Sequence, residues 1–133
     1  ARAHVDERLS TGEPHRGDVT VIRYPLEPRI FFIKRVIGLP GERIVINGGK
    51  ITIINTEHPE GFTLSEPYIQ YDKDEQIQRT VPNGEYFVMG DNRAASSDSR
   101  VWGTVPRKDM VGRALVRLLP IKKFDIFPGA YTY

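Results

Sequence analysis

Hydrophobic and polar residues alternate over short stretches along most of the chain, a pattern typical of β-strands. The first two predicted strands cover residues 19–24 and 30–37, which are rich in β-branched and aromatic side chains. The second strand ends at Gly38, and Pro40 and Gly41 form the next turn. The first third of the chain therefore predicts strands rather than helices.

A β-hairpin is the clearest local signal in the sequence. Residues 43–46 and 51–54 are hydrophobic and flank the segment Asn47-Gly48-Gly49-Lys50. An Asn-Gly pair tolerates the positive φ angles that a tight hairpin turn needs. Two further strands are predicted, at residues 85–89 and at residues 111–119 with a bulge near Gly112.

The segment 55–80 differs from the rest because it is polar and irregular. It predicts an excursion from the sheet, with one strand at 68–71. A single turn at 106–110 is the only helix candidate. Together these elements predict one all-β domain over residues 1–133, with coiled or barrel-like antiparallel sheets and a short excursion.

Composition narrows the class of protein. Twelve glycines and ten prolines among 133 residues fit a chain with many turns, and this length fits one domain. The chain contains no cysteine, which excludes disulfide frameworks, zinc–cysteine sites and thiol nucleophiles. No hydrophobic run reaches the ~20 residues that cross a bilayer, and no signal peptide is visible. The sequence as it stands therefore predicts a soluble domain.

Charge is distributed unevenly although the net charge is only +2. Residues 55–85 hold seven acids against two bases, and residues 100–133 hold seven bases against two acids. The two segments either face each other or water, or the basic one meets anionic lipid. Nucleic acid is not an expected partner, because no basic helix and no interleaving of basic and aromatic residues is present.

A lysine interrupts the most hydrophobic predicted strand. Lys34 shares one face of that strand with Phe32 and Val36, while Arg35 lies on the other face. Burial disfavours an ammonium ion and lowers its pKa, so a buried lysine can act as a general base near neutral pH. An edge-strand lysine that discourages aggregation gives the same pattern. This segment alone leaves both interpretations open.

The segment 90–100 follows a predicted strand and mixes small hydroxyl residues with an acid and several bases. Asp98 and Arg100 lie two residues apart, so in extended chain they point to the same side and predict an ion pair that makes the loop rigid. A turn rich in local side-chain hydrogen bonds is the alternative interpretation.

Three blocks, in this order, make the sequence resemble bacterial type I signal peptidases. Residues 16–25 resemble the family's Arg-Gly-Asp strand, residues 34–42 its Lys-Arg-x-x-Gly-Leu-Pro-Gly-acid block, and residues 90–100 its last signature block. The resemblance runs from about residue 14 to residue 120. It implies the family's β-fold in a compact version, and cleavage of signal peptides from secreted preproteins by a serine nucleophile and a lysine base.

The resemblance also implies roles for individual residues. Lys34 matches the general base, and Ser96 matches the hydroxyl that orients it. Phe32, where relatives often carry tyrosine, and Ile33 match positions that contact the substrate. The residues that match the supporting loop are Asp91, Asn92 and Arg93 in its turn, and Asp98 and Arg100 as an ion pair.

No metal or cofactor is implied. The implied partners are the signal peptides of secreted preproteins and, in the complete protein, a membrane surface. The implied location is the bacterial cytoplasmic membrane, with the catalytic domain on the extracytoplasmic side.

One departure from the family pattern is large. The family's nucleophile lies in a Ser-Met-x-Pro-Thr-like block well before the lysine, and none of the 33 residues before Lys34 resembles it. Ser10 lies in a loop-like segment without matching neighbours. We therefore expect the chain to lack both the nucleophile and the membrane anchor, and to be inactive alone.

Three explanations of this departure stay open. The chain is a piece of a longer protein, a non-catalytic homologue that binds peptides or proteins, or an unusual arrangement. A self-cleaving repressor-type protease also uses serine and lysine on a related fold. The residues of the motifs, Gly-Leu-Pro-Gly and Gly-Asp-Asn-Arg, disfavour that class, as does the lack of a DNA-binding helix pair.

Overall fold

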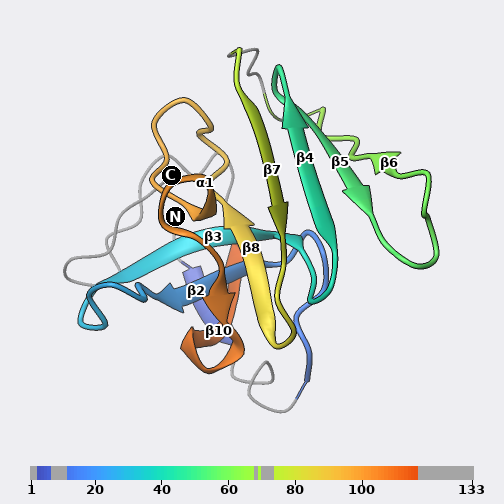
Figure 1. Cartoon of the computed structure of the whole chain (residues 1–133). Helices are drawn as coiled ribbons and strands as arrows, with labels where there is room; N and C mark the ends of the chain where they lie inside the picture. The colour runs from blue at the N-terminus through green and yellow to red at the C-terminus, as the bar shows by residue number, and fades with distance from the viewer. Residues whose placement is uncertain (1–2, 7–11, 68, 70–73, 117–133) are drawn as a thin grey trace.

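The computed structural model of the chain describes residues 3–6, 12–67, 69 and 74–116. Within them the strands form two antiparallel sheets (Figure 1). The first sheet has the order β1 (Ala3–Asp6), β10 (Met110–Val116), β2 (Val19–Arg23), β3 (Phe31–Gly38), β8 (Glu85–Met89) and β9 (Val105–Pro106). The second has the order β6 (Phe62–Thr63), β5 (Lys50–Ile54), β4 (Arg43–Asn47) and β7 (Gln76–Thr80). The all-β prediction is confirmed.

Most predicted strands are present within one or two residues of their expected bounds. The hairpin of β4 and β5 pairs Asn47 with Lys50, so Gly48 and Gly49 form its two-residue turn. Both glycines have positive φ, 57° and 84°, as this tight turn requires. The predicted bulge is also present, because the register of β10 against β2 shifts between Met110 and Gly112.

The expected excursion is partly wrong, because residues 55–80 contribute two strands to the second sheet. The strand β7 pairs with β4 over its whole length, from Thr80 opposite Arg43 to Gln76 opposite Asn47. Its sequence has one hydrophobic residue, Ile77, so its own pattern carries no strand signal. Pairing with β4 creates this strand. The strand predicted at 68–71 lies almost wholly outside the described residues.

Of the two short helices, one was predicted and one was missed. The single turn predicted at 106–110 is a 3-10 helix, Arg107–Asp109. A one-turn helix, α1 (Ser99–Trp102), is present where no helix was expected. One turn is too short to show helical periodicity, and its stability comes from the Asp98 cap rather than from a hydrophobic face.

Two hydrophobic clusters fill the molecule, and β3 and β8 contribute to both. The first cluster lies under the second sheet and consists of Ile37, Ile44, Ile46, Ile51, Ile53, Val81, Phe87 and Met89. The second lies on the other face of β3 and β8 and consists of Ile22, Phe32, Val36, Tyr86, Val88, Val105 and Met110. Strand alternation places Lys34 on the face of the second cluster.

The chain passes from the first sheet to the second at Gly38. A Cβ at this position would lie 2.5 Å from Cδ1 of Ile44 and 3.0 Å from Cβ of Phe87. Only glycine permits this close approach of the end of β3 to β4 and β8. The glycine therefore joins the strand that carries Lys34 to the hairpin that follows it.

Candidate active site

The centre of the candidate site is Lys34, in the middle of β3. Its side chain is buried, with 2% of the residue exposed. Its Nζ lies 2.8 Å from Oγ of Ser96 and 5.1 Å from the centre of the Phe32 ring. Thr20 on β2 lies opposite and donates its hydroxyl to the Lys34 carbonyl at 3.1 Å, which fixes the backbone.

The environment of Lys34 favours the neutral amine. Burial lowers the pKa of Lys34 to about 8, from an ordinary value of 10.5. The carboxylate of Asp98 partly offsets this lowering, and the guanidinium of Arg100 adds to it. An amine with this pKa is partly unprotonated near neutral pH and can accept a proton.

Ser96 is held by a compact loop that follows β8. The backbone N–H groups of Ala95 and Ser96 both donate to the carbonyl of Asn92, at 3.1 and 2.9 Å. Asn92 thus shapes the turn through its backbone. Because these bonds close the loop on itself, the Ser96 hydroxyl faces Lys34 from a defined position.

Asp98 and Arg100 form the predicted ion pair. The Asp98 side chain is fully buried, and it accepts from Nε and an Nη of Arg100 at 2.9 Å each. It also accepts from the backbone N–H groups of Gly90 and Arg100, at 3.1 Å each. These charge-assisted bonds tie the end of β8 to the start of α1.

A second link joins the loop to β3 on the opposite face from Lys34. Arg35 donates to both carboxylate oxygens of Asp91, at 2.8 and 2.7 Å, and to the carbonyl of Gly17 at 2.9 Å. Adjacent residues of one strand, Lys34 and Arg35, therefore bind the loop at its middle and at its start. Asp91 was expected from the sequence motif, but its partner Arg35 was not.

Arg93 is buried, although the sequence suggested only that it shapes the turn. Its Nε donates to the carbonyl of Gly90 at 2.8 Å, and its two Nη atoms donate to Glu66 at 2.9 and 2.8 Å. Arg100 has a further acidic partner, Glu75, at 3.1 Å. Sequence reasoning missed both glutamates, although the excess of acids in residues 55–85 was a signal.

Phe32 and Ile33 lie beside the lysine. The Phe32 ring packs 4.9 Å from Tyr24 and 6.2 Å from Trp102, measured between ring centres, and 7% of the residue is exposed. Ile33 points to the opposite face of β3 from Lys34 and is fully buried. Their contacts with a substrate stay predictions.

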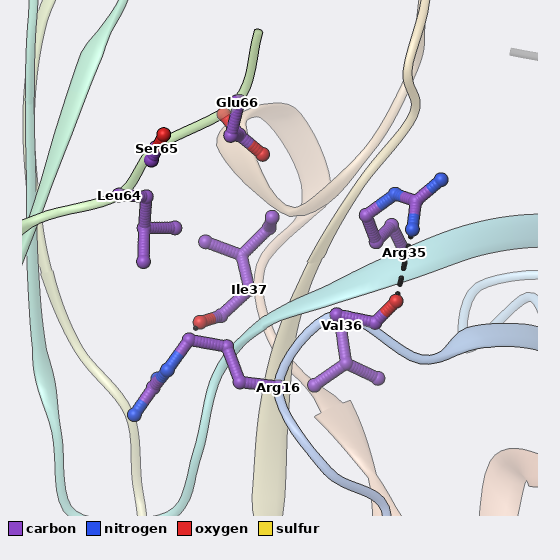
Figure 2. Close-up of a pocket in the computed structure, with 8 residues that line it drawn as sticks. Arg16, Arg35, Val36, Ile37, Leu64, Ser65 and Glu66 are labelled. Atoms are coloured by element: carbon purple, nitrogen blue, oxygen red, sulfur yellow. Dashed lines mark hydrogen bonds between the residues drawn. The ribbon is translucent and has the colours of Figure 1, made fainter. Parts of the chain in front are cut away.

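A cavity of about 210 Å³ lies between β3 and the segment 64–66 (Figure 2). In Figure 2, Arg35, Val36 and Ile37 line one side, and Leu64, Ser65 and Glu66 line the other. The lining does not include Lys34. The cavity therefore separates the back of the lysine strand from the segment that supplies Glu66.

Among the described residues, no group of three or more histidine, aspartate or glutamate side chains is arranged to hold a metal ion. None of the helices in that part of the chain is long and hydrophobic enough to cross a bilayer.

A buried lysine hydrogen-bonded to a serine on an all-β framework points to the serine–lysine class of hydrolases. The family model described as "Signal peptidase, peptidase S26" matches residues 2–119. The chain therefore belongs to the signal peptidase family, peptidase S26.

Individual relatives agree with this assignment. A signal peptidase I of Leptolyngbya laminosa is 43% identical over 119 residues, covering 83% of this chain and 55% of the relative. One of Pseudomonas aeruginosa is 38% identical, covering 80% and 49%. The crystal structure of a signal peptidase I from Enterococcus faecalis V583 superposes with a TM-score of 0.64 at 30% identity, covering 77% of this chain and 97% of that chain. The chain thus spans about half the length of the curated relatives it matches.

Proposed function

We propose that this chain supplies the general base and the supporting loop of a signal peptidase I, a serine endopeptidase that removes signal peptides from secreted preproteins. One observation carries the proposal: the Nζ of the buried Lys34 lies 2.8 Å from Oγ of Ser96, in surroundings that lower its pKa to about 8. Family membership supports the same activity.

In the proposed reaction Lys34 transfers a proton from the nucleophile to the leaving group. It first accepts the proton of a serine hydroxyl while that oxygen forms a bond to the scissile carbonyl carbon. It then donates the proton to the leaving amine as the carbon–nitrogen bond breaks. Water releases the acyl group by the same route. Ser96 keeps the lysine nitrogen oriented, while Asp91, Asn92, Arg93, Asp98 and Arg100 hold Ser96 in place.

We place the nucleophilic serine outside these 133 residues, since no block before Lys34 resembles the family's serine block. The substrate enters as an extended peptide beside β3, with small side chains before the scissile bond contacting Phe32 and Ile33. We place the reaction at the extracytoplasmic face of a bacterial cytoplasmic membrane, where the signal peptides of secreted preproteins emerge. The proposed chemistry uses protein side chains and water and includes no role for nucleic acid.

Cleavage of a preprotein by the complete gene product in detergent tests the proposal. Lys34→Ala removes the general base. We expect kcat/KM to fall by about 10³ or more, because the general base and the nucleophile act as one unit. The matched control is Lys50→Ala, at an exposed lysine at the start of β5, which keeps normal cleavage. Near-normal turnover of Lys34→Ala would contradict the mechanism.

Ser96→Ala separates orientation from nucleophilic attack. We expect cleavage reduced by about tenfold to a hundredfold, as for the loss of one positioning hydrogen bond. Complete loss, with an acyl group trapped on Ser96 in the wild type, would make Ser96 the nucleophile. Peptide binding without any cleavage by the complete gene product would favour the alternative, a non-catalytic peptide-binding module. One observation is consistent with that alternative. In the described part of the chain the serine bonded to Lys34 is Ser96, which in the proposed reaction has an orienting role and is not the nucleophile.

A further inference from the structure

Two glutamates from the segment between β5 and β7 bind the loop that carries Ser96. We propose that Glu66 and Glu75 are positioning residues for the Lys34–Ser96 pair, because each holds a buried arginine of this loop in place. The two glutamates act through the loop although they lie far from it in sequence. Their role rests on the proposed function.

Arg93 and Glu66 form the tighter of the two contacts. Both Nη atoms of Arg93 donate to the two oxygens of Glu66, and Nε donates to the carbonyl of Gly90. The side chains are 1% and 12% exposed. A bidentate contact fixes both the distance and the orientation of a guanidinium. Glu66 therefore determines where Arg93, three residues before Ser96, sits under the loop.

Arg100 and Glu75 hold the other end of the loop. Arg100 uses its guanidinium to bind Glu75, both oxygens of Asp98, and the carbonyl of Arg93 at 2.8 Å. Its side chain is 6% exposed. The bond from Arg100 to the Arg93 carbonyl joins the two contacts into one hydrogen-bond network. In the sequence, Ser96 lies between these two arginines.

The loop is thus held from two sides. From one side β3 binds it through Lys34 and Arg35. From the other side the segment across the cavity binds it through Glu66, which Figure 2 shows opposite Arg35 and Val36. Glu66→Gln removes the charged group that Arg93 binds, and Glu75→Gln removes one of the two carboxylates that Arg100 binds. Either change favours solvent entry and opening of the loop.

Nuclear magnetic resonance of the 133-residue chain tests this inference without any cleavage. The titration of the Lys34 side chain and the exchange rates of the Ala95 and Ser96 amides are measured in the wild type and in Glu66→Gln and Glu75→Gln. Glu57→Gln, an exposed acid of the same segment, is the matched control. Glu66→Asp, which keeps the charge on a shorter side chain, replaces Glu66→Gln if that variant does not fold.

We expect both glutamine variants to raise the pKa of Lys34 from about 8 towards 10.5, because loosening admits water to the ammonium group. We expect the two amides to exchange about tenfold faster or more, as for the loss of a charged hydrogen bond. The control leaves both values unchanged.

Three results would overturn the inference. An unchanged Lys34 titration with only a lower melting temperature would show a merely structural role. A lower pKa of Lys34 would show that the glutamates act only as distant charges, because removing a negative charge disfavours the ammonium ion. Equal shifts in the control would show a general charge effect. Failure of the complete gene product to cleave preproteins would contradict the proposed function and leave these measurements intact.

Discussion

The second sheet and the Ser96 loop each bury a set of side chains, but the two sets are of opposite kinds. The hairpin of β4 and β5 buries isoleucines at every second position, Ile44, Ile46, Ile51 and Ile53. The loop buries Arg93, Asp98 and Ser99 and faces the buried Lys34. The β4–β5 hairpin joins neighbours in sequence, whereas the loop is joined to β3 by residues up to 62 positions apart.

This difference determines how each region fails. A buried isoleucine contributes by transferring hydrocarbon from water, and removing one leaves a cavity but no unmet charge. A buried ion depends on its partner, and removing the partner leaves an uncompensated charge in a medium of low polarity. The hydrophobic sheet should therefore tolerate single losses that the loop does not.

The largest stability effect is expected at Asp98. Asp98→Ala leaves the buried guanidinium of Arg100 without its main partner and the Gly90 N–H without its acceptor. We expect a loss of about 3–5 kcal/mol in the free energy of unfolding, measured by urea denaturation. The control is the exposed pair of Arg29 and Glu27. Glu27→Ala should change the free energy of unfolding by less than about 1 kcal/mol. A similar, small loss for both variants would contradict the contrast between the regions.

A smaller loss is expected in the second sheet. Ile53 is fully buried, so Ile53→Ala should lower the free energy of unfolding by about 2–4 kcal/mol. The pKa of Lys34 should stay at about 8, because Ile53 belongs to the first cluster whereas Lys34 lies on the face of β3 that carries the second. Urea denaturation and an NMR titration of Lys34 in Ile53→Ala measure the free energy of unfolding and the pKa. A large shift of the Lys34 pKa would show that the two regions are coupled.

Replacing the lysine itself should stabilise the protein. Between pH 8 and pH 10.5 the unfolded chain binds the Lys34 proton more tightly than the folded chain, so the stability of the wild type rises with pH over this window. Lys34→Met avoids burying a charge. It should raise the free energy of unfolding by about 3 kcal/mol below pH 8, and the advantage should vanish above pH 10.5. Urea denaturation at several pH values measures it, and a destabilised Lys34→Met at pH 6 would contradict the low pKa.

The same contrast explains what the sequence predicts well. The strands of the hairpin follow from local alternation, and β8 has the predicted bounds, residues 85–89. Lys34, Ser96 and the Asp98–Arg100 pair were recognised because they stand in short, ordered motifs. The Asp98–Arg100 pair is local, whereas Lys34 and Ser96 were matched to one site through the resemblance of their two blocks to a single family.

Features that depend on distant partners escaped prediction. The polar strand β7 forms because β4 offers it a complete set of hydrogen bonds. Glu66 and Glu75 look like any solvated acids in sequence, and only the fold brings them to Arg93 and Arg100. Their selection depends on three-dimensional proximity, which a local pattern does not contain.

The account rests on Lys34 being a buried amine of lowered pKa next to Ser96. The most direct test is an NMR titration of its Cε and Nζ nuclei in the wild-type chain. We expect a midpoint at about pH 8, together with a shift of that midpoint in Ser96→Ala. A midpoint near the ordinary value of 10.5, unaffected by Ser96→Ala, would contradict the account.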